Sequence, residues 1–556
     1  MIEESRKWMI LVATTWIQAF TGTNFDFSSY SSDLKSVLNI TQVQLNYLSV
    51  ASDLGKAFGW CSGVSLLYFP LWVVVLLSAF MGLVGYGLQW LVIQGLISLP
   101  YIVVFFLCLT AGCSICFFNT ICYVLCIRNF PANRALALSL STSFNGVSAA
   151  LYTLIANAIN SNDDALYLLL NAIIPILVSG LALIPILRQP QPQPLSADAI
   201  QRNTLVFLCL NILAIIIGLY LLLLNSLSSN ATRARIFLLG AVFLLILQLF
   251  LPSVVHAREW DCCAVPSSFC LYNSSFNAVD PDEVELHKEL IEYNASNDDS
   301  QSFIEKQSCF AKLIEKDQLT TLGQEHTSRL LVRRWDFWLY YVAYFFGGTI
   351  GLVYSNNLGQ ISQSLGLSSQ TSSLVTVYSA CSFFGRLLSG IPDFFHEKMH
   401  FARTGWFAIA LVPTPIAFIF LALSGSEASV RLSTGLIGLS SGFIFSAAVS
   451  ITSELFGPNS VGINHNIVIS NIPIGSLLYG LLAALIYDSN ADSSSTIFSW
   501  LTTMSMCMGR KCYLQTFIIW GSISFLGLVS STLLYLRTKQ AYRNVERNRN
   551  RSGNSY

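Results

Sequence analysis

A few charged side chains stand inside long apolar runs of this sequence, and their chemistry needs explaining first. Asp53 and Lys56 are three residues apart, which places them on one face of a helix. An ionisable group inside hydrocarbon is costly, so each such residue is a functional candidate by default. A buried carboxylate carries a proton when its charge state changes, which makes Asp53 the candidate for proton coupling. A structural ion pair with Lys56 is the alternative interpretation.

A polar stripe precedes this pair in the first apolar run. Gln18, Asn24 and Asp26 fall there together with Thr21 and Thr23. A helix face that points to lipid does not tolerate such a stripe, so the stripe lines a cavity or makes polar contacts with neighbouring helices. The sequence leaves these two interpretations open.

Further candidates lie in the later apolar runs. Arg386 pairs with Asp393 or a helix terminus, or it contacts a substrate, and we expect Lys56, Arg386 and Asp393 to take part in gating. Asn145 and Asn471 each cap a helix break, form a bond between helices or contact a ligand. Tyr344 lies deep enough in its apolar run to reach a cavity.

The composition indicates the kind of element that positions these residues. Hydrophobic residues make up 53% of the 556 positions and charged residues only 11%, so too little polar surface remains to solvate a soluble globule. A helix needs about 20 mostly apolar residues to cross a bilayer. The sequence predicts about fourteen such spans, near 8–30, 43–66, 70–93, 100–127, 133–159, 164–187, 205–225, 235–256, 336–358, 371–391, 402–423, 430–453, 461–487 and 514–536.

Lysine and arginine set the orientation of these spans. Outside the interior of the long polar loop they concentrate on one side, which predicts that both termini are cytosolic. The glycosylation sequons at Asn39 and Asn230 then fall on the opposite side. The predicted regions are an N-terminal six-helix bundle (1–190), a linker with two additional helices (191–256), an acidic cytosolic loop (257–334), a C-terminal six-helix bundle (335–538) and a basic cytosolic tail (539–556).

An internal repeat relates the two predicted bundles. A shift of 326 positions pairs Gly112 with Gly438 and Asn145 with Asn471, and it aligns the loops FPAN and FGPN without a gap. A second similarity joins Gly55-Lys56 to Gly385-Arg386. Two halves of common ancestry leave a site between them near the middle of the bilayer, and rocking of the halves about that site gives alternating access.

The cysteines and the short motifs add no catalytic chemistry. Most of the 14 cysteines fall in apolar helices and pack as small hydrophobes, Cys113 and Cys116 included, so we expect no metal site. Cys507 and Cys512 stand on a predicted outer loop, where a disulfide is one of two open alternatives. We find no nucleotide-binding loop, no zinc-protease helix and no GxSxG, so we expect neither an enzyme nor a cofactor.

Several long segments resemble the plant nodulin-like branch of the major facilitator superfamily. They are RKWMILVATTWIQAFTGTNFDFSSYSSDLKSVL, VASDLGKAFGW, FNGVSAALYT, GGTIGLVYSNNLGQI, FFGRLLSGIPDF and ELFGPNSVGINHNI. The resemblance implies a transporter fold and a role in the fusion of nuclei. One departure is that GWCSGVSLLYFPLW carries no acid or base where the superfamily commonly has both, whereas Gly385-Arg386, Gly390 and Asp393 come closer to that pattern.

The sequence therefore predicts an all-α polytopic membrane protein with the major facilitator fold. We expect a monomeric secondary transporter in a lipid bilayer, moving a small polar solute or organic anion by alternating access with a link to protons. Nucleic acid is not an expected partner. A membrane sensor or scaffold that kept the fold without transport is the alternative.

Overall fold

The computed structural model describes residues 2–23, 27–40, 42–160, 165–189, 197–225, 231–264, 319, 321–394, 401–492 and 507–553. Every regular element in these ranges is helical. The first bundle is built from α1 (Ile2–Thr21), α2 (Phe27–Leu38), α3 (Gln42–Ala57), α4 (Gly59–Tyr68), α5 (Leu71–Ile93), α6 (Tyr101–Asn129), α7 (Arg134–Ser143), η2 (Phe144–Val147), α8 (Ser148–Ile159) and α9 (Leu166–Ile186).

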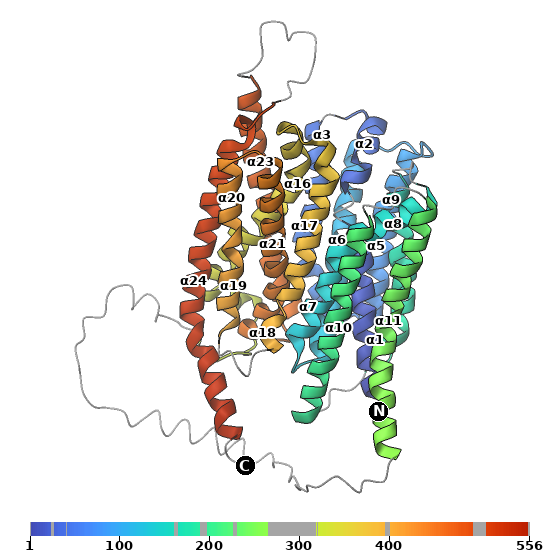
Figure 1. Ribbon diagram of the computed structural model, residues 1–556, viewed down its shortest axis with the longest axis vertical. Helices are drawn as coiled ribbons and strands as arrows, with labels where there is room; N and C mark the ends of the chain where they lie inside the picture. Colours follow the sequence, from blue (N-terminus) through green and yellow to red (C-terminus); the bar gives the residue numbers. More distant parts are fainter. Residues whose placement is uncertain are drawn as a thin grey trace, which may run out of the picture. The chain divides into compact units, whose positions relative to one another are not determined.

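Two further long helices separate this bundle from the second one. They are α10 (Ala197–Asn225) and α11 (Ala231–Ala264). The second bundle follows as α14 (Ser328–Leu331), α15 (Trp335–Tyr344), η3 (Phe345–Thr349), α16 (Ile350–Ser364), η4 (Ser368–Gln370), α17 (Thr371–Leu388), α18 (Ile391–Phe394), α19 (Arg403–Leu411), α20 (Pro413–Leu423), α21 (Glu427–Phe456), α22 (Val461–Ile469), α23 (Asn471–Asp492) and α24 (Lys511–Gly553). In Figure 1, α1 begins and α24 ends on the same side of the bundles.

The helices have the length and composition of membrane spans. Within the described residues, 11 helices are long and apolar enough to cross a bilayer. The other three predicted spans are helical but interrupted, as α1 and α2, as α3 and α4, and as α7, η2 and α8. The chain is thus an all-α, multi-pass membrane protein, and the count of fourteen spans stays a prediction.

Some boundaries differ from those that the sequence predicts. α24 continues to Gly553, so residues 539–553 of the predicted tail extend the last helix. The described residues up to Val255 and from Leu319 onwards form one compact unit. The end of the predicted loop therefore belongs to the unit that holds the bundles. Apolar periodicity does not detect the continuation of α24 to Gly553, because residues 539–553 are mostly polar.

The segment before α15 is held to the second bundle by polar contacts. The Glu325 carboxylate accepts hydrogen bonds from the backbone N–H groups of Asn459, at 2.8 Å, and Ser460, at 3.1 Å. These donors precede α22, so Glu325 satisfies N–H groups at the start of that helix. The His326 carbonyl accepts a further bond from Asn464 Nδ2 at 2.9 Å. These contacts are polar and join distant parts of the chain, so no hydrophobic pattern in the sequence reveals them.

The additional helices pack against both bundles. On α11, Gln248 Oε1 accepts a hydrogen bond from Thr15 Oγ1 of α1 at 3.0 Å. On α10, a Cβ at Gly218 would lie 2.3 Å from the Phe383 ring of α17, so only glycine permits this approach. α10 therefore contacts the second bundle, while α11 is bonded to the first.

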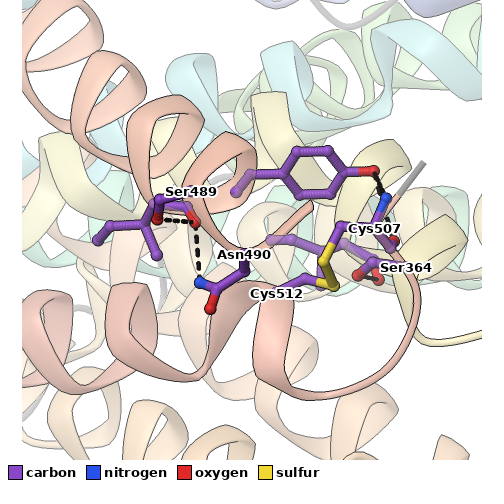
Figure 2. Close-up of a disulfide and its surroundings, with 8 residues drawn as sticks. Ser364, Ser489, Asn490, Cys507 and Cys512 are labelled. Carbon is purple, nitrogen blue, oxygen red and sulfur yellow. Dashed lines mark hydrogen bonds between the residues drawn. A yellow bond between two sulfur atoms is a disulfide. The ribbon is translucent and has the colours of Figure 1, made fainter. Parts of the chain in front are cut away.

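A disulfide joins Cys507 to Cys512 at the start of α24, which decides the alternative that the sequence left open. Figure 2 shows the bridge beside Ser364, whose carbonyl accepts a hydrogen bond from Gly509 N at 2.7 Å. The bridge and this bond together fix the turn that leads into the last helix.

The glycosylation candidates differ in what the structure describes. Asn39 is exposed at the end of α2, with a φ of 50° that asparagine tolerates better than most residues. Asn230 lies outside the described residues. The orientation of the bundles in the membrane stays a prediction.

We predict that Asn39 and Val545 lie on opposite sides of the membrane. Both positions are exposed, and α24 carries Val545 on the side where α1 begins. In sealed membrane vesicles with the cytosolic face outwards, Val545→Cys should react with a membrane-impermeant maleimide, whereas Asn39→Cys should react only after permeabilisation. Measuring the label on each purified variant, against the unsubstituted chain as background, checks this. The reverse pattern would show that the termini are not cytosolic.

Candidate functional site

A cavity with about 800 Å³ of empty volume lies between the two bundles. Its lining comes from α1, α3, α6, α7 and η2 of the first bundle and from α15, α16, α17, α21, α22 and α23 of the second. The lining residues are Gln18, Gly22, Lys56, Ile115, Cys116, Asn119, Tyr123, Thr142, Asn145, Tyr344, Leu352, Arg386, Phe445, His465, Ile469 and Ile472. Five of these are sequence candidates, namely Gln18, Lys56, Asn145, Tyr344 and Arg386. We call this space the central cavity.

Arg386 brings a positive charge to the central cavity. Arg386 is only 8% exposed, and its Nη1 donates a hydrogen bond to the Thr142 carbonyl at 3.0 Å. The guanidinium carbon lies 5.8 Å from the centre of the Phe445 ring, within cation–π range. Its Nε is buried without a hydrogen-bond partner. No ion pair between Arg386 and a carboxylate occurs within the described part of the chain.

Of the two partners that the sequence left open for Arg386, Asp393 is wrong and a helix terminus is correct, because the Thr142 carbonyl lies in the last turn of α7. Asp393 instead forms an ion pair with Arg403, whose Nε also contacts Glu454 at 2.9 Å. Tyr542 donates a hydrogen bond to the same glutamate at 2.7 Å. The chain turns after α17, which brings Asp393 to the start of α19 and away from the cavity side of Arg386. Asp393 thus belongs to a network inside the second bundle, and a gating role for it stays a prediction.

Asp53 and Lys56 form the expected pair, and the pair also reaches the other bundle. Lys56 Nζ lies 2.6 Å from Asp53 Oδ1. The other carboxylate oxygen accepts hydrogen bonds from Ser476 Oγ of α23 at 2.8 Å and from Asn356 Nδ2 of α16 at 3.4 Å. Asp53 therefore joins three helices from two bundles through one carboxylate. The contacts to Ser476 and Asn356 leave no signal in the sequence, because more than 300 positions separate these residues from Asp53.

A second cavity, with about 510 Å³ of empty volume, adjoins this pair. Lys56 and Leu352 line both cavities, so the two spaces are neighbours. The remaining lining residues of this side cavity are Thr23, Phe27, Tyr30, Ser49, Ser52, Asp53, Tyr86, Gln89, Cys108, Ala111 and Asn356. Asn24 and Asp26, which the sequence places in the same polar stripe as Gln18, lie outside the described residues.

The two repeat-related asparagines bond to the first span of their own bundle. Asn145 Nδ2 donates to Gln18 Oε1 at 3.2 Å, and Asn471 Oδ1 accepts from Thr349 Oγ1 at 2.8 Å. Each asparagine also stands at an interruption of its helix, Asn145 within η2 and Asn471 at the first residue of α23. The surroundings differ, because Asn145 lines the central cavity whereas Asn471 is fully buried.

The sequence analysis missed Thr349, although the repeat contains a signal for it. The segment FTGT at 20–23 matches FGGT at 346–349 with the same shift of 326 positions. η3, which contains Thr349, is a π-helical turn, a distortion that often accompanies functional sites in α-helices. A search of the first span of each bundle at that shift would have found the residue.

The packing of the second span supports the equivalence of Lys56 and Arg386. A Cβ at Gly55 would lie 2.3 Å from the Leu109 carbonyl oxygen, and a Cβ at Gly385 would lie 2.1 Å from that of Leu439. In both bundles a glycine thus lets the second span touch the fourth, and the next residue is a cation. Both cations line the central cavity. This geometry explains why the GK and GR pairs recur in the sequence.

Another seam between the bundles lies along α4 and α22. A Cβ at Gly63 would lie 2.4 Å from the Gly462 carbonyl oxygen, so the two backbones are in contact. Asn466 Nδ2 donates to Thr120 Oγ1 at 2.9 Å, and Cys116 Sγ donates to Asn466 Oδ1 at 3.4 Å. The Cys116 thiol therefore acts as a hydrogen-bonded packing group. No cluster of three or more metal-ligating side chains occurs among the described residues.

His465 also lines the central cavity. Its ring packs edge-on against Tyr123 with 5.6 Å between centroids, and its Nδ1 lies 3.4 Å from Thr452 Oγ1. The ring is fixed between the bundles by these contacts. The ring adds a polar group to the lining that also contains Arg386. No charged partner of His465 occurs among the described residues.

Comparisons with known proteins agree with this architecture. The family described as Nodulin-like matches residues 7–256, and the family described as NFD4, C-terminal domain matches residues 321–543. The Protein NUCLEAR FUSION DEFECTIVE 4 of Arabidopsis thaliana is 54% identical over 553 residues, which cover 99% of this chain and 92% of that protein. The Probable transporter mch1 of Emericella nidulans is 26% identical over 239 residues, 36% of this chain and 38% of its own.

A solved structure shares the fold. The major facilitator superfamily proton:xylose symporter XylE, bound to 6-bromo-6-deoxy-D-glucose, superposes with a TM-score of 0.53. The match covers 94% of each chain at 12% sequence identity. At this identity the likeness concerns the fold alone, which is the major facilitator fold.

We predict that the two asparagines have different roles. Asn471→Ala should lower the melting temperature, by the equivalent of about 0.6 kcal/mol for an average hydrogen bond in a membrane, and leave substrate affinity unchanged. Asn145→Ala should weaken substrate affinity about two- to tenfold, as one lost hydrogen bond implies, with little change in melting. Melting and uptake measured on both variants check this, with Thr349→Val as a matched control that should reproduce Asn471→Ala. Equal effects of the two alanines on affinity would contradict the assignment.

Proposed function

The chain belongs to the nodulin-like family with an NFD4 C-terminal domain, and from the central cavity we propose that it is a secondary active transporter of a small organic anion. Two repeat-related bundles around a cavity are the architecture on which alternating access depends. The relationship to the Probable transporter mch1 supports a transport function. The chemistry of the cavity supports the anion.

The observation that carries the proposal is the guanidinium of Arg386. A charge removed from water is strongly unfavourable unless a counter-charge or hydrogen-bond partners compensate it. Arg386 has a carbonyl and an aromatic face as partners, and its Nε has none. A carboxylate in the central cavity would supply the missing charge and accept the free N–H. The planar guanidinium suits carboxylates because it donates two parallel hydrogen bonds.

The rest of the lining suits a small organic anion. Gln18, Asn119 and Asn145 bring amide groups that fix the orientation of a polar ligand. Tyr123, Tyr344 and the aliphatic lining residues offer surface for a short carbon skeleton. Gln18 Nε2 is buried without a partner, so a donor is free to bond a second polar group of the ligand.

Alternating access requires that contacts between the bundles break on one side at a time. One set joins α3 to α16 and α23 through Asp53, and another joins α4 and α6 to α22 through the bonds of Asn466 to Ser62, Thr120 and Cys116. Because α3 and α4 are successive parts of one span, the two sets lie at different depths. Each set consists of a few polar contacts, so rocking of the bundles can exchange one for the other.

We also extend a process and a coupling ion to this chain. The Arabidopsis relative is named for a defect in nuclear fusion, and we propose that this chain serves the same process. Protons are the proposed coupling ion, with Asp53 as the carrier. In plants that lack this protein, the wild-type gene should restore the fusion of nuclei. A gene that encodes Arg386→Gln should not restore it, if transport underlies the role.

We predict that Arg386 determines anion affinity. In proteoliposomes, uptake of radiolabelled short-chain carboxylates should require the protein, and Arg386→Gln should raise the apparent KM about tenfold or more, because a charged hydrogen bond contributes about 1.5–3 kcal/mol. Arg386→Lys keeps the charge without the two parallel bonds and should be intermediate. Arg431→Gln is the matched control, since Arg431 is a half-exposed partner of Glu427 on α21.

Two results would contradict this function. Carboxylate uptake with wild-type KM in folded Arg386→Gln protein would remove the anion site. Absence of uptake or exchange of any solute by folded wild-type protein would favour the alternative, a membrane sensor or scaffold that retains the transporter fold.

A further inference from the structure

The two cations of the central cavity are equivalent in the repeat but not in their charge environment. Lys56 and Arg386 each follow a glycine that touches the fourth span of its bundle, and each lines the central cavity. Lys56 is paired with the Asp53 carboxylate at 2.6 Å, whereas Arg386 has no carboxylate partner in the described residues. The repeat thus provides two anion-binding positions, and one of them is already occupied by a side chain.

The charge of the combined site follows directly from its lining. Asp53 is the one carboxylate among the residues described as lining the central and side cavities, and Lys56 and Arg386 are the two cations. With Asp53 ionised, the site carries a net charge of plus one, which a monoanion neutralises. With Asp53 protonated, it carries plus two, which a dianion neutralises. Both loaded states are then neutral, which minimises the cost of moving the site through the membrane.

We propose that Asp53 competes with the substrate for Lys56, so that the protein carries monoanions when Asp53 is ionised and dianions together with one proton when Asp53 is protonated. This inference rests on the proposed function and specifies its substrate class. The proton binds a carboxylate oxygen of Asp53, the ion pair with Lys56 is lost, and the Lys56 ammonium turns to the second anionic group of the substrate. Proton and dianion together carry the same net charge as a monoanion.

The surroundings of Asp53 connect this exchange to movement of the bundles. Besides Lys56, the titratable groups of the side cavity are Tyr30 of α2, Tyr86 of α5 and Cys108 of α6. From the second bundle, Ser476 and Asn356 face the carboxylate, and both are uncharged donors. A carboxylic acid accepts hydrogen bonds less strongly than a carboxylate, so protonation weakens the contacts to α23 and α16 as well. Binding of the proton therefore loosens one set of contacts between the bundles.

The test measures selectivity between monoanions and dianions in proteoliposomes over an acidic-to-neutral pH series. Butyrate and succinate form one pair of labelled probes. Ethanesulfonate and ethanedisulfonate form a second, and their own charges do not change over this range. In the wild type, the ratio of dianion to monoanion uptake should rise as the pH falls. In Asp53→Asn, the ratio should be high and independent of pH, about tenfold above the neutral wild-type value, because one further charged hydrogen bond becomes available.

Two further variants keep the test decisive if Asp53→Asn does not fold. Asp53→Asn combined with Lys56→Gln removes the pair without leaving a buried charge, and it should favour monoanions at every pH. Ser476→Ala removes one contact between the bundles and one donor to the Asp53 carboxylate. It should therefore shift the rise of the ratio to higher pH and leave the limiting ratios at low and high pH as in the wild type. An unchanged ratio across pH in the wild type, or a wild-type ratio in the double variant at low pH, would overturn the inference. Absence of uptake of all four probes by the wild type would instead count against the proposed function.

Discussion

The cost of a charge in hydrocarbon is the constraint on which the interior of this protein depends. Hydrocarbon offers no solvation, so an ionised group inside the bundles needs a partner of opposite charge or must face a wet cavity. Asp336 pairs with Arg537 at 2.5 Å, Glu454 with Arg403 at 2.9 Å, and Asp53 with Lys56 at 2.6 Å. Arg386 has no carboxylate partner among the described residues and meets the second condition, because it lines the central cavity. In the function proposed above, the substrate anion supplies the counter-charge.

The internal repeat explains both the symmetry of the site and its asymmetry. Each bundle provides a glycine and a cation on its second span, and an asparagine at an interruption of its fifth span. The surroundings of these residues differ between the bundles. Lys56 is paired with Asp53, and Asn471 is enclosed with Thr349 whereas Asn145 lines the cavity. The repeat thus holds a cation with a carboxylate partner in one half and a cation without one, among the described residues, in the other.

Interrupted helices bring these polar groups together inside the bundles. A continuous α-helix satisfies its own backbone, whereas an interruption lets backbone and short side chains approach a neighbouring span. η2 carries Asn145 to Gln18, and the π-helical η3 carries Thr349 to Asn471. The break between α3 and α4 separates Asp53 from the seam with α22. The three predicted spans without an uninterrupted long apolar helix are divided between α1 and α2, between α3 and α4, and at η2, whereas the turn at η3 leaves its span continuous.

The sequence by itself determined the class of the protein, most span positions, the two-bundle repeat and the polar residues of its interior, because these follow from apolar run length, spacing and self-similarity. It also predicted the Asp53 and Lys56 pair, since both residues lie on one turn of one helix. Only the tertiary structure decided that Arg386 faces the central cavity while Asp393 pairs with Arg403, and that Asp53 reaches Ser476. Those contacts join residues far apart in the chain, and their geometry depends on how ten or more helices pack together, which no local pattern records.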